Sequence, residues 1–194
     1  MSLVKIIVAS TRPGRFGIQP ANWLMELAKE HPETTFELVD LKKIDLPFLD
    51  EETPALYAKY ANAHTKAWAK AIGEADGFII VTAEYNHSYP APLKNAIDFL
   101  AKEWYYKPVA YVGYGAEAGG ARAVEHLRSL GATVALFDLR ESLIIPNYWT
   151  QLDEQGAFQP NEAQTKAAHD ILTKIGFWSE ELKTPRAKLE KTGK

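Results

Sequence analysis

Five short apolar runs, separated by segments with helical spacing, dominate the hydrophobic pattern of this chain. The runs are rich in β-branched residues, which is typical of buried strands, and they cover 3–9, 35–40, 77–82, 108–113 and 133–139. Helix-start signals and apolar residues at helical spacing predict helices over 18–29, 54–71, 92–100, 121–130 and 161–176. Because strands and helices alternate, the sequence predicts one α/β domain on a five-stranded, doubly wound parallel sheet.

The bounds of this domain follow from where the alternating pattern ends. We expect the domain to span residues 1–182. Residues 183–194 are basic and lack an apolar face, which predicts a flexible tail. Residues 41–53 contain Pro47 and show no clear periodicity, so we expect an irregular surface excursion there.

Composition narrows the class of protein. The chain has 194 residues, a net charge of −3 and no cysteine, which excludes disulfides and thiolate chemistry and predicts no basic face for nucleic acid. The five histidines are scattered along the sequence, and we expect no metal site. The sequence shows neither a signal-peptide pattern nor an apolar run of membrane length. We therefore expect a cytoplasmic protein without a membrane partner.

The turn after the third predicted strand is unusually rich in aromatic and polar residues. It has the sequence E-Y-N-H-S-Y over residues 84–89 and is followed by a helix. A turn in this position lies at the carboxyl edge of a parallel sheet, where ligands of such folds bind. The turn is either a well-capped surface loop or, as we favour, a platform for a flat aromatic ring system.

The loop after the first strand combines the groups that bind phosphate. Residues 10–17 hold two hydroxyls, two arginines and two glycines just before a helix N-terminus. They match neither the G-x-x-x-x-G-K-[ST] loop nor G-x-G-x-x-G, so the expected guest is a phosphate monoester. The alternative is that Ser10 and Thr11 cap the backbone while Arg12 is solvated.

The glycine-rich loop after the fourth strand allows two interpretations. Residues 113–118 formally match G-x-G-x-x-G/A. Asp138 follows at about the sequence spacing expected for a residue that contacts the ribose. This interpretation would indicate a dinucleotide-binding dehydrogenase. That fingerprint normally follows the first strand of its unit. We favour the second interpretation, in which small residues let the backbone approach the edge of a flat ligand.

Three of these motifs together resemble the NADPH-dependent FMN reductase family. They are S-x-R at 10–12, E-Y-N at 84–86 and L-K-N-A-I-D at 93–98, and the resemblance covers about residues 4–175. The first family motif usually reads G-S-x-R-x-x-S-x-N. Here Arg15 stands in place of the second serine and Gly17 in place of the asparagine, while Ala83 replaces the usual proline before Glu84.

The resemblance implies a flavodoxin-like three-layer sandwich and a specific chemistry. It implies that FMN takes electrons from NADPH or NADH and passes them to a small-molecule acceptor such as a quinone, an azo compound, a metal ion or free flavin. The flavin carries the chemistry, so we expect no catalytic side chain. The residues expected to bind the cofactor are Ser10, Thr11, Arg12, Arg15, Phe16, Gly17, Ile18, Ala83, Glu84, Tyr85, Asn86, His87, Gly113, Gly115 and Gly119.

Relatives in this family are dimers or tetramers, which implies a homodimer or homotetramer here. We expect the helix from Leu93 at the interface and Trp104 at a subunit contact. An FMN-binding electron carrier or sensor without NADPH turnover is the alternative function. Arg15 has three possible roles: it contacts the FMN phosphate, it contacts the 2′-phosphate of NADPH, or it is solvated.

Overall fold

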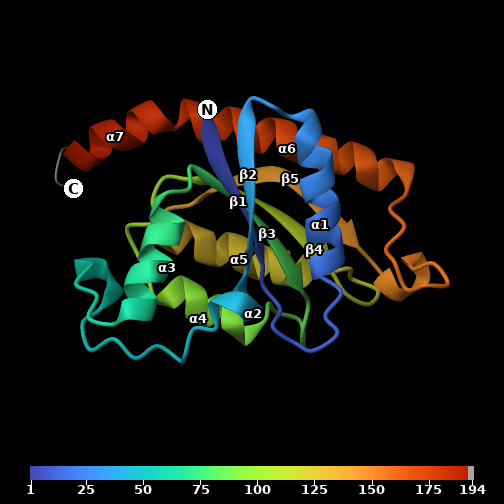
Figure 1. Cartoon of the computed structure of the whole chain (residues 1–194), viewed down its shortest axis with the longest axis horizontal. Coiled ribbons are helices and arrows are strands. Elements are labelled where there is room, and N and C mark those ends of the chain that lie inside the picture. Colours follow the sequence, from blue (N-terminus) through green and yellow to red (C-terminus); the bar gives the residue numbers. More distant parts are fainter. Residues whose placement is uncertain (192–194) are drawn as a thin grey trace.

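The computed structural model describes residues 1–191 and contains one five-stranded, entirely parallel sheet (Figure 1). Its strands are β1 (Ser2–Val8), β2 (Thr34–Asp40), β3 (Gly77–Ala83), β4 (Pro108–Tyr114) and β5 (Phe137–Ile145). Their order in the sheet is β2-β1-β3-β4-β5, which is the strand order of flavodoxin-like folds. The predicted fold class is confirmed.

Seven α-helices accompany the strands in residues 1–191, and both faces of the sheet are covered. They are α1 (Ile18–Leu27), α2 (Leu41–Ile44), α3 (Ala63–Gly73), α4 (Ala91–Asp98), α5 (Ala121–Thr133), α6 (Glu162–Glu181) and α7 (Lys183–Lys191). None of these helices has both the length and the apolar character needed to cross a membrane.

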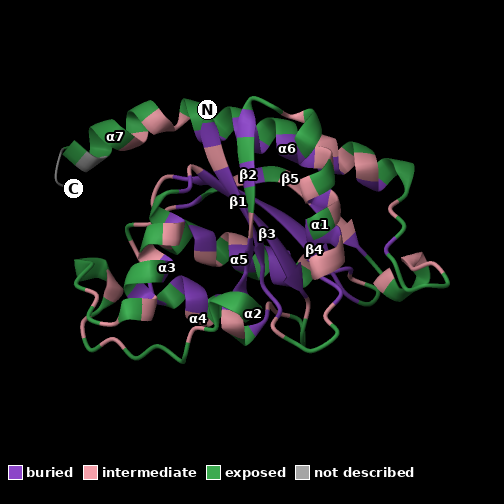
Figure 2. Cartoon of the chain, viewed as in Figure 1, coloured by how far each residue is buried: buried purple, intermediate pink, exposed green. Residues whose placement is uncertain are grey.

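Neighbouring residues of each central strand belong to two different hydrophobic cores. Ile6 of β1 packs in a cluster with residues of α1 and α6, whereas Ile7 packs in a second cluster with residues of α3, α4 and α5. Every residue of β3 and β4 is buried, because helices cover both sides of these strands (Figure 2). The sheet is therefore the middle layer of a three-layer sandwich.

The fifth strand lies later in the chain than its apolar run predicted. The predicted strand over 133–139 is correct only for residues 137–139, because α5 continues to Thr133 and Ala135 adopts a left-handed conformation with φ 51°. Gly131, which looked like a helix stop, lies inside α5. A Cβ there would come within 3.2 Å of Asp138 Oδ2, so this glycine permits close packing against β5.

The helix predicted over 54–71 begins nine residues later. Residues 55–57 form only a single 3₁₀ turn, and Ala58 ends it in a left-handed conformation with φ 51°. The Glu51 carboxylate then accepts hydrogen bonds from the Ala61 and Asn62 N–H groups, at 2.8 and 2.9 Å. These bonds fix the chain just before α3 begins at Ala63.

The C-terminal segment is helical through Lys191 rather than a loose tail. Asn161, the first residue of the predicted last helix, caps α6, and it exchanges reciprocal hydrogen bonds of 2.9 Å with Gln164. Beyond α6, Arg186 of α7 donates to Asp76 at 2.6 Å. The expectation of a flexible tail is therefore wrong for residues 183–191, and residues 192–194 lie outside the described part of the chain.

Trp104 is a core residue. It is 1% exposed, its Nε1 donates to the Ile97 carbonyl at 3.2 Å, and its ring meets that of Phe78 with centroids 5.0 Å apart. The expectation that Trp104 lies at a subunit contact is wrong. The Trp104 ring instead closes the core against Phe78 of β3.

Gly120 allows the loop after β4 to fold back onto that strand. Its φ is +95°, and an added Cβ would lie 2.4 Å from the Tyr114 nitrogen. Gly156 also has a positive φ, +78°, but an added Cβ there would meet nothing within 4 Å. Substituting Gly156 by alanine therefore measures only the cost of the left-handed backbone. The same substitution at Gly120 adds the cost of the clash with β4.

We expect Gly156→Ala to lower the free energy of unfolding by about 1–2 kcal/mol, the conformational cost alone. Gly120→Ala should cost more than this because β4 must also move away from the loop. Urea unfolding followed by far-UV circular dichroism measures both values. Equal losses for the two variants would show that the close approach at Gly120 has no energetic weight.

Candidate functional site

Three loops meet at the carboxyl edge of the sheet, after β1, β3 and β4. Backbone hydrogen bonds continue the sheet into them, from Ala9 N to Val81 O at 3.0 Å and from Glu84 N to Tyr114 O at 2.9 Å. The Ser10 and Tyr85 hydroxyls lie 2.8 Å apart and join the first loop to the second. The fold thus brings together the loops that the sequence singled out.

Buried residues anchor the β1 loop to the protein core, while its Arg12 side chain is exposed to solvent. Ser10 is buried and its Oγ accepts a hydrogen bond from Arg12 N at 3.3 Å. The Arg12 side chain is exposed and forms no ion pair within residues 1–191. Phe16 is buried, stacked on Tyr148 with ring centroids 4.4 Å apart and packed edge-on against Phe158 at 5.2 Å. The Phe16 ring therefore fixes the loop to the core.

Arg15 is not a solvated side chain. Its guanidinium forms an ion pair with Asp40 at the end of β2, and the two side chains are only 11% and 4% exposed. The other Asp40 oxygen accepts from Lys42 N at 3.0 Å and caps α2. The Nε atom of Arg15 is buried without a hydrogen-bond partner in the described chain. The solvated alternative is thus wrong, while the two phosphate roles remain predictions.

Gly17 makes room for Tyr114, a residue that the sequence did not indicate. A Cβ added at Gly17 would lie 2.7 Å from the Tyr114 hydroxyl. Burial, followed by the charge of Tyr85, raises the pKa of Tyr114 above that of an ordinary tyrosine, so the hydroxyl stays protonated. That hydroxyl is buried and makes no hydrogen bond within residues 1–191.

The β3 loop is a tight turn with two exposed residues at its tip. Asn86 and His87 both have left-handed backbones, with φ 50° and 68°. Tyr85 and Ser88 exchange backbone hydrogen bonds of 2.8 and 3.0 Å on either side of them. Neither Asn86 nor His87 donates a backbone N–H hydrogen bond within residues 1–191. The turn therefore offers two free donors on a preformed support.

Glu84 and Arg122 tie the second loop to the third. The Glu84 carboxylate accepts from Arg122 N at 3.1 Å and from the Arg122 guanidinium at 2.6 Å. The carboxylate is nearly buried at the N-terminal end of α5, where a negative charge is favourable. Half of the Arg122 side chain remains exposed beside the turn. Arg122 was not predicted, because its link to Glu84 spans 38 positions.

The glycines of the β4 loop serve packing within the protein. A Cβ at Gly113 would come within 3.0 Å of Gly120 O, and one at Gly119 within 2.6 Å of Ile144 Cγ2. One at Gly115 would touch Glu84 Cβ at 3.4 Å. These three positions let the backbone approach other parts of the chain closely.

The dinucleotide fingerprint is contradicted by the position of Asp138. This residue lies near the start of β5, opposite Val109 near the start of β4, and accepts a hydrogen bond from Tyr111 Oη at 2.6 Å. It is therefore at the amino end of the sheet, whereas the 113–118 loop is at the carboxyl end. A ribose bound at that loop cannot reach it.

Two cavities adjoin at the site and share Glu84. The smaller cavity, about 50 Å³, is lined by Arg12, Gly14, Arg15, Phe16, Ala83, Glu84, Tyr85, Tyr114, Gly115 and Tyr148. The larger, about 470 Å³, is lined by Glu84, Asn86, His87, Ala116, Glu117, Ala118, Arg122, Asn147 and Trp149. Five of the predicted cofactor contacts besides Thr11 line neither cavity: Ser10, Gly17, Ile18, Gly113 and Gly119.

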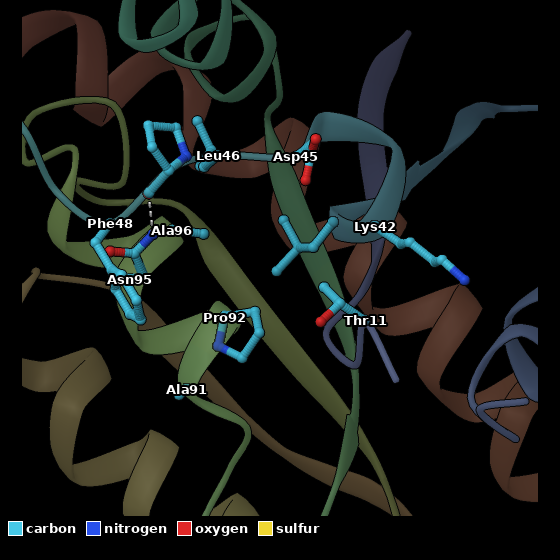
Figure 3. Close-up of a pocket in the computed structure, with 11 residues that line it drawn as sticks. Thr11, Lys42, Asp45, Leu46, Phe48, Ala91, Pro92, Asn95 and Ala96 are labelled. Carbon is cyan, nitrogen blue, oxygen red and sulfur yellow. Dashed lines mark hydrogen bonds between the residues drawn. The ribbon is translucent and has the colours of Figure 1, made fainter. Parts of the chain in front are cut away.

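Thr11 lines a third cavity, of about 700 Å³, on the other side of the β1 loop (Figure 3). Residues from the 41–48 segment and one side of α4, at 91–92 and 95–96, form the rest of its wall. Asn95 of α4 holds this wall together, because its side chain donates to Pro47 O at 2.7 Å and accepts from Leu49 N at 3.0 Å. Thr11 is thus separated from the other predicted phosphate contacts.

Comparison with known proteins identifies the family. Residues 2–150 match the family described as NADPH-dependent FMN reductase. This chain belongs to that family. As an NADPH-dependent FMN reductase family member it is an oxidoreductase that uses FMN and NAD(P)H, as its motifs predicted. The alternative of a carrier or sensor without NADPH turnover is not favoured.

Named relatives of this FMN reductase family member are reductases. It is 33% identical over 181 residues to an NAD(P)H-dependent FMN reductase of Schizosaccharomyces pombe, covering 91% of this chain and 88% of the relative. It is 31% identical over 169 residues to an NAD(P)H:quinone oxidoreductase of Solanum tuberosum, covering 82% and 84%.

Solved structures support the fold of the family member. The flavoenzyme NAD(P)H:(acceptor) oxidoreductase FerB from Paracoccus denitrificans superposes with a TM-score of 0.73 at 24% identity. The match covers 94% of this chain and 99% of FerB.

The contact between Gly17 and Tyr114 can be tested with a double-mutant cycle. Gly17→Ala should destabilise the protein by about 1–3 kcal/mol, because the new methyl group overlaps the phenol. Tyr114→Leu removes that phenol, so Gly17→Ala should cost little in its presence. We expect a favourable coupling energy of about 0.5–3 kcal/mol from urea unfolding of all four proteins. Additive losses would contradict this contact.

Proposed function

We propose that the protein transfers electrons from NAD(P)H, through FMN held by the β1, β3 and β4 loops, to a small quinone-like acceptor. The observation that carries this proposal is the meeting of a cationic, hydroxyl-bearing loop and a rigid aromatic turn at one edge of the sheet, joined by Ser10 and Tyr85. The quinone oxidoreductase of Solanum tuberosum supports the class of acceptor. The cytoplasm is the compartment that we propose.

The phosphate of FMN would lie in the smaller cavity. Its lining supplies the exposed Arg12 guanidinium and two buried polar atoms without hydrogen-bond partners in the described chain, Arg15 Nε and Tyr114 Oη. Buried donors of this kind are uncommon in native proteins, and oxygens of a phosphate or ribityl chain would satisfy them. The residues present therefore fit the polar end of FMN.

The ring system would lie along the larger cavity, against the turn at 84–87. When bound, FMN supplies the acceptance and delivery of hydride. The protein orients it: the N–H groups of Asn86 and His87 are free to donate to ring oxygens and nitrogens. Arg122, held in place by Glu84, lies at the rim and can bind an anionic substrate group. No acid or base need come from a side chain.

A second copy of the chain would cover the remaining apolar surface, giving a homodimer or homotetramer. Residues 45–62 leave large apolar side chains in water, among them Phe48, which is 86% exposed, Leu56 and Tyr57. This segment borders the cavity of about 700 Å³ beside α4 (Figure 3). Several large apolar side chains exposed on one segment are typical of a protein interface.

The cofactor assignment predicts about one FMN per chain, retained through Arg12. Arg12→Ala should weaken FMN binding about tenfold to a hundredfold, the effect of losing a charge-assisted hydrogen bond of roughly 1.5–3 kcal/mol. Quenching of FMN fluorescence during titration of the apoprotein measures the affinity. Arg140→Ala, which removes another exposed arginine, is the matched control and should leave it unchanged.

The same preparations test turnover. Anaerobic addition of NADPH should bleach the flavin absorption, and a quinone should restore it. A protein that fails to quench FMN fluorescence would disprove the cofactor site. If NADPH did not reduce the bound flavin, the protein would instead be an electron carrier.

The Arg15–Asp40 pair predicts a stability effect that must be separated from flavin binding. Arg15→Ala leaves a buried carboxylate unpaired and should cost about 3–5 kcal/mol of unfolding free energy. Asp40→Asn removes the carboxylate but keeps a good helix cap, so the double variant should be more stable than Arg15→Ala. Urea unfolding measures these differences.

Flavin affinity in the same variants then assigns Arg15. If its Nε contacts the phosphate, the double variant should bind FMN at least about tenfold more weakly than Asp40→Asn alone. Equal FMN affinities would contradict that contact. Equal affinities with a raised NADPH Michaelis constant, and an unchanged NADH one, would place Arg15 on the 2′-phosphate of NADPH.

A further inference from the structure

Two histidines that are far apart in the sequence share one small site on the protein surface. His31 precedes β2 and His169 lies on α6, 138 positions later. Their facing nitrogens, His31 Nε2 and His169 Nδ1, are 3.3 Å apart, and their ring centroids are 5.5 Å apart. The turn before β2 and the middle of α6 are thereby joined (Figure 1).

The other nitrogen of each ring faces a carboxylate. His31 Nδ1 lies 3.7 Å from Glu33 Oε1, and His169 Nε2 lies 3.9 Å from Glu30 Oε2. Histidines that bind metals usually direct their second N–H to a carboxylate or carbonyl, which fixes the tautomer and leaves the facing nitrogen as a ligand. Each ring here has its own carboxylate beside its second nitrogen, at ion-pair rather than hydrogen-bond distance.

We propose that His31 and His169 form a binding site for a divalent transition-metal cation, with Zn²⁺ as its representative. Two Zn–N bonds of about 2.0–2.1 Å at a tetrahedral angle place the two nitrogens about 3.3–3.4 Å apart. The separation in the protein is 3.3 Å, which already matches this spacing, so only a rotation of the rings is needed to direct both nitrogens at one cation. No group of three or more histidine, cysteine or acidic residues within residues 1–191 could hold a metal, so water completes the coordination.

Metal binding replaces the hydrogen bond between the two rings without a change in their net protonation. In the neutral pair each imidazole carries one proton, and one of these lies between the rings. Binding requires lone pairs on both facing nitrogens, so that proton moves to the outer nitrogen of its ring. There the outer N–H meets Glu33 or Glu30, and the two carboxylates offset part of the charge of the cation.

The site would act as a clamp between secondary-structure elements. His31 lies before the amino end of β2, whereas the loops proposed to bind FMN lie at the carboxyl end of the sheet. A cation bound there would join α6 to the entry of β2 and stabilise the folded state, because the unfolded chain holds the two residues far apart.

Titration of ZnCl₂ into the flavin-loaded protein by isothermal calorimetry tests this site. We expect about one Zn²⁺ per chain, a higher melting temperature and loss of at least tenfold in affinity in both His31→Gln and His169→Gln. Glu33→Gln should weaken Zn²⁺ binding by about tenfold or somewhat more through the orientation of His31. His64→Gln is the matched control: His64 and His169 are equally exposed at 33%, and His64 faces Asp50 but no second histidine.

Each variant must also be shown to be folded before its Zn²⁺ affinity is compared with that of the wild type. Because His31 is largely buried, circular dichroism of each variant without metal establishes that it is folded before titration. Long-range ¹⁵N NMR of the imidazoles should show both protons on the outer nitrogens once Zn²⁺ is added. Absence of Zn²⁺ binding, or binding that His169→Gln leaves unchanged, would overturn the proposal and leave the pair as a simple hydrogen bond.

Discussion

Burial of the central strands on both faces is the constraint on which this structure depends. With β3 and β4 covered on both sides, no side chain of these strands can face solvent except at their ends. Polar chemistry is therefore confined to the loops, and the parallel direction of all five strands places three of these loops at one edge. Backbone hydrogen bonds from Ala9 and Glu84 continue the sheet into those loops, which makes the edge a rigid support.

At two positions of the β1 loop the chain has a different residue from its family motif. In both cases the substituted residue lies against a residue from another part of the fold. Where the motif has a serine, Arg15 reaches Asp40 on the neighbouring strand. Where it has an asparagine, Gly17 leaves space for Tyr114. Each substitution thus changes the β1 loop and a distant strand end at once. The result is a loop whose polar atoms facing the small cavity differ from those of the usual motif.

Local sequence patterns were enough to predict β1 to β4, the cap of α6 and the three loops of the candidate site. Apolar runs and turn-forming residues can be recognised within a few positions of the sequence. Such patterns were not enough for β5, for the start of α3 or for α7, nor for several single residues. Gly131 and Gly176 looked like helix stops, yet both lie within helices, where they leave room for Asp138 and Thr34. Trp104 was expected at a subunit contact but is buried in the core. Such roles depend on neighbours from other parts of the chain. The pairs of Arg15 with Asp40, Glu84 with Arg122 and His31 with His169 were missed for the same reason.

The aromatic stack beneath the β1 loop has a consequence for how that loop moves. Phe16 is held between Tyr148 and Phe158, and Gln19 at the start of α1 bonds the backbone of Gly156 and Phe158 at 3.0 and 2.6 Å. The loop cannot open unless the segment leading into α6 opens with it, so the two form one cooperative unit. In hydrogen exchange, amides of the β1 loop and of residues 156–158 should therefore become protected and deprotected together. The amides of Asn86 and His87, which make no backbone hydrogen bond within residues 1–191, are outside this cooperative unit and should exchange on their own timescale.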